Sequence, residues 1–306
     1  MLKRLAGSLV VLGLFGAGAG WVLSAPNPLP DAVIAALPDG DPGRGELVFW
    51  AGGCASCHAA PGAKGGDKLQ LGGGLKLETP FGVFVSPNIS SDTEDGIGDW
   101  SKADFANAVL TGTSPEGAHY YPAFPYTSYA RMSLVDTADL FAFMKTLPAV
   151  SGKAASHELG FPFNIRRGLG LWKLLNLSPD PVIEEPSELG ETERDLWLHG
   201  RYLVEGPGHC SECHTPRDAL GGLDIAHWLE GAPAPTGEGR VPGLDPSSDM
   251  GGWSLADIAY YLESGFTPEY DSVGGEMVDV QANMAKLPAS DREAIATYLK
   301  ALPPHQ

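Results

Sequence analysis

The chain has 306 residues, 43% of them hydrophobic, which is enough to fill the cores of two domains of ordinary size. Its 38 acidic residues outnumber 20 basic ones, and the formal net charge of −18 argues against nucleic-acid binding. Gly (40) and Pro (26) together exceed a fifth of the chain and predict long loops, whereas 7 Trp, 9 Tyr and 11 Phe exclude a disordered chain.

The N-terminus has the pattern of an export segment. Lys3 and Arg4 precede an uncharged run from Leu5 to Ala25, which prolines follow. An A-x-A cleavage site is present within this run, but the run is also long enough to span a bilayer. We therefore expect residues 1–25 to be an export signal or, as their length favours, an uncleaved membrane anchor that leaves the rest of the chain in the periplasm.

All four cysteines belong to two copies of one motif, Cys-x-x-Cys-His. Two thiols three positions apart lie on one face of a helical turn, where both can bond the vinyl groups of one haem, and the histidine can then bind the iron. We expect one covalently attached haem c at each copy, two in all. Pro61 and Pro216, which follow the histidines, would orient each imidazole through a neighbouring carbonyl. The copies are Cys54, Cys57 and His58, and Cys210, Cys213 and His214.

Zinc binding and disulfide bonding are the alternatives. A structural zinc site usually places its two cysteine pairs about 15 to 20 residues apart, whereas Cys57 and Cys210 are 153 positions apart. Disulfides would leave both histidines unexplained, and neither motif lies in the βαβ pattern of a thioredoxin-like protein. Haem attachment therefore explains the pattern best.

The signals around the two motifs recur at a spacing near 155 residues. In each half a short helix containing a glycine precedes the motif, and a long loop leads to a helix that begins at a capping box and ends at a glycine. A last helix then ends before a proline. The paired signals are Gly45 and Gly200, the capping boxes Ser101–Asp104 and Ser254–Asp257, the helix ends Gly112 and Gly265, and Pro148 and Pro303.

This repeat predicts a mainly α protein with two tandem domains, each wrapped around one covalently attached haem. A glycine in the first helix would let the last helix cross it closely, with Phe143 or Tyr298 on the opposite side. The expected domains are residues 40–150 and 190–304, joined by a linker over 151–189.

The middle of the linker is apolar and basic. Arg166, Arg167 and Trp172 could clamp the two domains together or bind a haem propionate. The simpler interpretation is an ordinary packed linker.

The order of elements resembles the class I cytochromes c. The stretches "FGVFVSPNISSDTEDGIGDWS" and "GAHYYPAFPYTSYARMS" resemble the dihaem and trihaem cytochrome c subunits of bacterial membrane-bound alcohol dehydrogenases and their relatives. The segment "GGEMVDVQANMAKLPASDREAIATYLKALP" resembles later haem domains of the same family. The likeness covers residues 40–150 and 190–304 and implies a class I cytochrome c fold and electron transfer.

The sixth ligand of each iron decides between a closed carrier and an open site, and methionine sulfur is the usual ligand of a carrier. Met277 matches the ligand methionine of the resembling subunits and is preferred to Met284, which precedes the last helix. In the first half those subunits carry "PAMPY", whereas Phe124 stands in the place of the ligand here. Met132 is then the first choice, with His119 or an open position as alternatives.

We therefore expect a dihaem cytochrome c that transfers single electrons between a periplasmic dehydrogenase and the respiratory chain. The acceptor would be a quinone, a soluble cytochrome or a terminal oxidase, and the acidic surface predicts a partner with a basic docking face. The alternatives are a haem enzyme, such as a peroxidase or a sulfur-compound oxidoreductase with an open or weakly ligated first haem, and a redox sensor or assembly factor. No catalytic residue is predicted.

Overall fold

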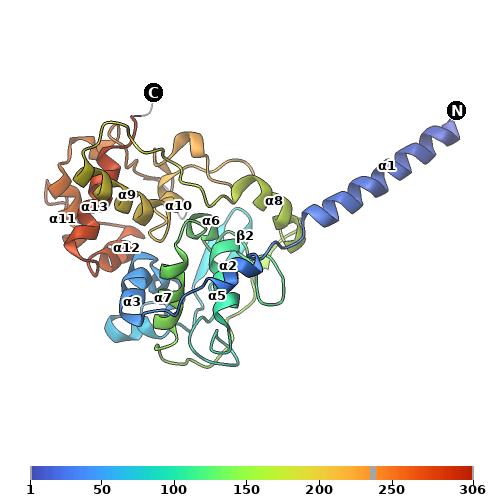
Figure 1. Ribbon diagram of the computed structural model, residues 1–306, viewed down its shortest axis with the longest axis horizontal. Helices are drawn as coiled ribbons and strands as arrows, with labels where there is room; N and C mark the ends of the chain where they lie inside the picture. Colours follow the sequence, from blue (N-terminus) through green and yellow to red (C-terminus); the bar gives the residue numbers. More distant parts are fainter. Residues whose placement is uncertain (1, 235–238, 305–306) are drawn as a thin grey trace.

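The computed structural model describes residues 2–234 and 239–304, with side chains from residue 13 onward in those ranges. Helices joined by long loops dominate the molecule (Figure 1), which confirms the predicted mainly α class. The strands are short, and the longest have four residues. Buried side chains from both halves of the chain form one continuous hydrophobic core.

The same order of helices occurs on both sides of the linker, as the sequence predicts. In each half the helix before the Cys-x-x-Cys-His motif packs against the last helix: α3 on α7, and α9 on α13. The first half contains α2 (Asp31–Ala35), α3 (Pro42–Ala51), α4 (Cys54–His58), η1 (Gly65–Leu69), β1 (Lys76–Thr79), β2 (Gly82–Val85), α5 (Lys102–Thr111), α6 (Tyr126–Tyr129) and α7 (Leu134–Met144). The second half contains α9 (Glu191–Glu205), α10 (Ser211–His214), η3 (Ile225–His227), β4 (Ala232–Pro233), β5 (Arg240–Val241), η4 (Asp249–Gly252), α11 (Leu255–Ser264), α12 (Met277–Met284) and α13 (Ala289–Lys300).

The two helix crossings depend on glycine, as predicted. A Cβ atom at Gly45 would lie 1.9 Å from the Asp139 carbonyl oxygen and 2.8 Å from the Cβ of Phe143. At Gly200 the corresponding distances are 1.9 Å to the carbonyl oxygen of Ala294 and 2.9 Å to the Cβ of Tyr298. No other residue type would fit at these distances, so both backbones can approach only because the side chain is missing.

Both capping boxes form. The Ser101 hydroxyl accepts a hydrogen bond from the Asp104 N–H while the Asp104 carboxylate accepts one from the Ser101 N–H, and α11 begins with the same exchange between Ser254 and Asp257. Each helix ends where the sequence predicts, at a glycine with left-handed backbone.

Short antiparallel strands pair within the long loops. β1, β2 and β3 (Glu158–Leu159) form an antiparallel sheet in that order, so a linker strand joins the loop of the first half. In the second half β4 pairs with β5. The linker also contains η2 (Arg166–Gly168) and α8 (Leu169–Asn176).

Linker residues contact both halves of the chain, as the clamp interpretation requires, although the two arginines contact only residues that precede the linker. Arg166 donates to the His119 carbonyl oxygen (2.8 Å), and Arg167 donates to the Trp21 carbonyl oxygen (2.7 Å). Trp172 does reach the second half, where its indole N–H donates to the Leu220 carbonyl oxygen (3.0 Å). Lys173 adds a second contact to the first half, where its ammonium donates at 2.7 Å to two carbonyl oxygens at the end of α5.

Helix α1 (Leu2–Leu23) projects from the body of the molecule (Figure 1), and its C-terminal end lies beside α8. Phe15 and Trp21 on it are exposed. Within the described ranges, no helix combines the length and the apolar character needed to cross a membrane.

Candidate haem sites

The first motif forms a single helical turn, α4, directly after α3. Gly53 precedes it with left-handed backbone (φ of 59°), which turns the chain sharply between the two helices. Cys54, Cys57 and His58 are half-buried, and both cysteines are free thiols. The His58 Nδ1–H donates to the carbonyl oxygen of Pro87 at 2.9 Å.

The second motif repeats this geometry. Its last four residues form α10, and His209 occupies the position of Gly53 with a left-handed φ of 39°. His214 is buried, and its Nδ1–H donates to the carbonyl oxygen of Pro242 at 2.7 Å. Both cysteines of this motif are also free and half-buried.

The carbonyl bonds prepare both imidazoles to bind iron. With Nδ1 donating, the lone pair lies on Nε2, which is the nitrogen free to bind a metal. Burial lowers the pKa of His58 and of His214, which favours the neutral ring that ligation requires. The prediction that Pro61 and Pro216 would have neighbouring carbonyls in this role was wrong, because the acceptors lie much further along the chain.

A repeated signal could have identified these acceptors. Pro87 lies 29 residues after His58, and Pro242 lies 28 residues after His214. Each proline lies within the long loop of its half, just after a short strand (β2 or β5), and the near-equal spacing persists although the loop sequences differ.

The four cysteines of the two motifs are free thiols in surroundings that disfavour the charged form. Burial raises the pKa of Cys54 and of Cys210 to about 12 and that of Cys213 to about 11, so the neutral thiols predominate. In the part of the chain that the structure describes, no three His, Cys, Asp or Glu side chains gather closely enough to hold a metal ion. The two pairs therefore do not combine into the zinc site considered as an alternative.

The repeat also relates the two candidate sixth-ligand segments. Tyr120 N–H donates to the Gly112 carbonyl oxygen (2.8 Å), and Val273 N–H donates to the Gly265 carbonyl oxygen (2.7 Å). Counted from these equivalent bonds, Phe124 and Met277 occupy the same position. Met277 is half-buried at the start of α12 and packs against the core.

The remaining candidates are all buried. Met132 is 6% exposed and lies two residues before α7, at the position that Leu287 occupies before α13. Met284 is 4% exposed. His119 is already engaged through Nε2, which donates to the Ser24 carbonyl oxygen at 2.9 Å. Met132 and Met277 stay the predicted sixth ligands.

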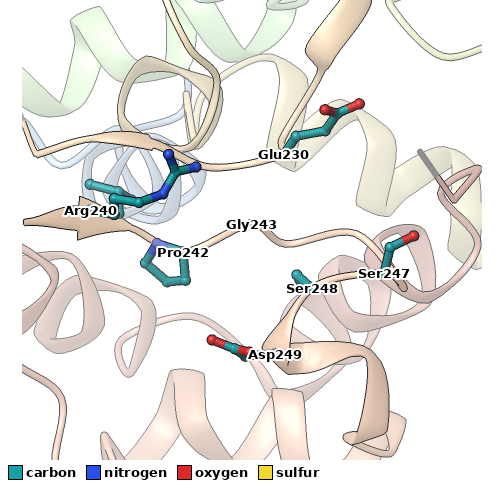
Figure 2. A pocket seen from close by; sticks show the side chains of 8 residues that line it. Glu230, Arg240, Pro242, Gly243, Ser247, Ser248 and Asp249 are labelled. Carbon is teal, nitrogen blue, oxygen red and sulfur yellow. The ribbon is translucent and has the colours of Figure 1, made fainter. Parts of the chain in front are cut away.

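A pocket of about 370 Å³ lies beside the second motif. Figure 2 shows Arg240 on one side of it, Glu230 and Asp249 on others, and Pro242 at its border. Because the Pro242 carbonyl holds His214, the loop that lines this pocket also fixes the second imidazole.

Comparison with known proteins agrees with this geometry. Residues 43–148 match the family model described as cytochrome c. The chain is 50% identical over 303 residues to a protein described as diheme cytochrome c-type from Cereibacter sphaeroides, covering 99% of both chains. It is 36% identical to the cytochrome c subunit of a quinone alcohol dehydrogenase from Gluconacetobacter polyoxogenes and 35% identical to the fructose dehydrogenase cytochrome subunit of Gluconobacter japonicus. These matches cover 90% and 85% of this chain, and 59% and 52% of those relatives.

Proposed function

The chain belongs to the dihaem c-type cytochromes, and from this premise we propose that it transfers single electrons from a dehydrogenase to the respiratory chain. Its cofactors are two covalently bound haem c groups, and it is an electron carrier rather than an enzyme. The observation that carries the proposal is the geometry of the two motifs. In both, the cysteines lie on one helical turn, and the imidazole that follows is held by a carbonyl with Nε2 free.

Each haem would be held by residues of its own half. Cys54 and Cys57 would carry the first group and Cys210 and Cys213 the second, with His58 and His214 binding the irons. Met132 and Met277 would close the opposite positions. A haem bound in this way exchanges one electron by cycling between Fe(III) and Fe(II). The protein supplies ligation, burial and the surface on which partners dock.

The proposed domain boundaries are those of the sequence repeat: residues 40–150 and 190–304, joined by a linker over 151–189. The two glycine-dependent crossings support them, because each pairs the first and last helices of one half. Linker contacts from Lys173 and Trp172 would then fix the domains to each other.

The proposed location is the periplasm, reached through the export segment at residues 1–25. The relatives named as dehydrogenase cytochrome subunits support a dehydrogenase as electron donor. With a net charge of −18, the protein would bind a donor or acceptor that presents a basic face.

Rapid-mixing kinetics of the oxidised holoprotein test this function. The holoprotein is mixed first with a substrate-reduced quinone alcohol dehydrogenase and then with an oxidised soluble cytochrome. Both haems should be reduced in the first step and reoxidised in the second, within one turnover of the dehydrogenase. The rate should fall as salt rises if a basic face docks on the acidic surface. Turnover of peroxide, or fast binding of carbon monoxide without electron exchange, would contradict the proposal and favour a haem enzyme.

A further inference from the structure

The two haem-attachment helices, α4 and α10, both contact the other half of the chain, and α10 lies beside α6 of the first half (Figure 1). Each is bonded to the opposite half through the residue just before its second cysteine. At the first motif, the Asn283 amide donates to the Ser56 hydroxyl at 2.8 Å. At the second, the hydroxyls of Thr127 and Ser128 donate to one carboxylate oxygen of Glu212, at 2.9 and 3.3 Å.

These contacts are related by an approximate twofold axis. Asn283 and Ser128 both lie six residues before the last helix of their half. Arg131 and Lys286, three residues after Ser128 and Asn283, again contact the opposite half. The Arg131 guanidinium lies 3.9 Å from the Glu205 carboxylate, and the Lys286 ammonium lies 5.7 Å from the centre of the Trp50 ring. Each attachment helix therefore contacts, through equivalent positions, the segment that precedes the last helix of the other half.

Charge breaks this symmetry. The position before the second cysteine is an uncharged serine in the first motif and a carboxylate, Glu212, in the second. The Glu212 side chain is 11% exposed, whereas its ion-pair partner Arg217, at 2.6 Å, is 38% exposed. Water therefore screens the guanidinium more than the carboxylate, and the negative charge dominates at the attachment helix.

Holding the halves together does not require this charge. At the equivalent place, the uncharged pair of Asn283 and Ser56 makes the same cross-contact. A carboxylate kept nearly out of water, between the two cysteines that carry a haem, must affect that haem electrostatically. It stabilises Fe(III), the form with one more positive charge, over Fe(II).

We propose that Glu212 lowers the redox potential of the haem at the second motif, where a nearly buried carboxylate stands at the position that the uncharged Ser56 occupies in the first motif. Thr127 and Ser128 of the first half hold the carboxylate in place, so they are positioning residues for this effect. The proposal rests on the proposed electron-transfer function. It implies that Glu212 favours the passage of electrons from the second haem to the first.

Equilibrium redox titration of the purified holoprotein tests the proposal with two mirrored substitutions. Glu212→Gln keeps an oxygen that can accept from Thr127 and Ser128 but removes the charge, so one midpoint should rise. Ser56→Asp adds a charge at the equivalent position, so the other midpoint should fall. Adding or removing a unit charge beside the attachment cysteines should change the oxidised-to-reduced ratio of the affected haem roughly fivefold.

Asp39→Asn is the matched control, because it removes a fully exposed carboxylate and should move neither midpoint. Haem content and circular dichroism establish that each variant is folded. The proposal holds if the two substitutions move different midpoints in opposite directions. It is overturned if folded Glu212→Gln leaves both midpoints unchanged or shifts both equally. Titration needs no protein partner, so a failed electron exchange with dehydrogenase would not affect this result.

Discussion

The two histidines of the attachment motifs depend on carbonyl oxygens that lie far along the chain. Each motif provides a helical turn with two thiols and an imidazole, but Pro87 and Pro242 select the ring nitrogen that is free. The orientation of a proximal ligand is therefore decided by the loop that returns to the motif. Carbonyl oxygens carry no side-chain signature, so only the near-equal spacing of the two prolines after their histidines could have pointed to them.

At the same scale, the sixth ligands give a direct prediction. In near-infrared magnetic circular dichroism of the oxidised holoprotein, Met277→Ala should abolish the sulfur-to-iron charge-transfer intensity of one haem. Met132→Ala should abolish that of the other, because a methionine sulfur bound to iron is the source of the band.

Met284→Ala is the control for these variants. Met284 is 4% exposed in the core, so its truncation should cost about 2–5 kcal/mol of unfolding free energy and leave both bands in place. If Met132→Ala retains both bands, Met132 is not a ligand, and a variant of His119 becomes the next to measure.

At the scale of elements, the crossings of α3 with α7 and of α9 with α13 are the contacts that shape each half. The backbone of the first helix approaches the last so closely that a single added carbon would overlap a carbonyl oxygen. Aromatic rings on the last helix fill the space beside the crossing, with Phe143 against Phe49 and Tyr298 against Trp197.

Gly45→Ala and Gly200→Ala should each destabilise the protein by at least about 1–3 kcal/mol, because the new methyl group forces the helices apart. Denaturant unfolding of the holoproteins measures this loss. Gly168→Ala is the matched control, since its backbone is helical (φ of −60°) and nothing lies within 4 Å of the new atom. It should be neutral or stabilising by up to about 1 kcal/mol; equal losses in all three variants would refute the crossing argument.

At the scale of the whole molecule, α8 connects the two halves through neighbouring residues. Trp172 bonds the second half, while Lys173 bonds the end of α5 and lies 4.6 Å from the centre of the Tyr126 ring. Burial lowers the pKa of Lys173 to about 7. The linker is thus fixed by a lysine whose charge is costly in the folded state.

This lysine predicts a pH dependence of stability. An unfolded lysine titrates near 10.4, so between pH 7 and about 10 the unfolded chain binds more protons than the folded protein. The free energy of unfolding should therefore gain up to about 1.4 kcal/mol per pH unit from Lys173 as pH rises through this window, and less below pH 7. Lys173→Met should remove that contribution.

Chemical denaturation of the unmodified and Lys173→Met holoproteins at pH 7 and pH 9 measures how the free energy of unfolding of each changes with pH. The comparison with Lys173→Met cancels the titration of other groups that the two proteins share. Identical slopes would mean that the Lys173 ammonium keeps its charge through its two carbonyl contacts.

The sequence by itself determined the local elements, including the helical turn at each Cys-x-x-Cys-His motif. The crossing glycines were recognised through the repeat, which marks the same position in both halves. Cys-x-x-Cys-His at 54–58 and 210–214 and the two capping boxes are local patterns, and the structure forms a helical turn or a helix start at each. Such patterns depend on residues within a few positions of one another, so the linear order is sufficient to recognise them.

Only the tertiary structure decided which distant residues meet. The bonds of the histidines to their carbonyl acceptors, the contact of Lys173 with the end of α5, and the contact between Glu212 and Thr127 join positions from 28 to 85 residues apart. Side chains that bond backbone oxygens, or one another across two halves, leave no spacing that a helical or strand period would reveal. Their partners are fixed by how the halves pack, and packing is a property of the folded chain as a whole.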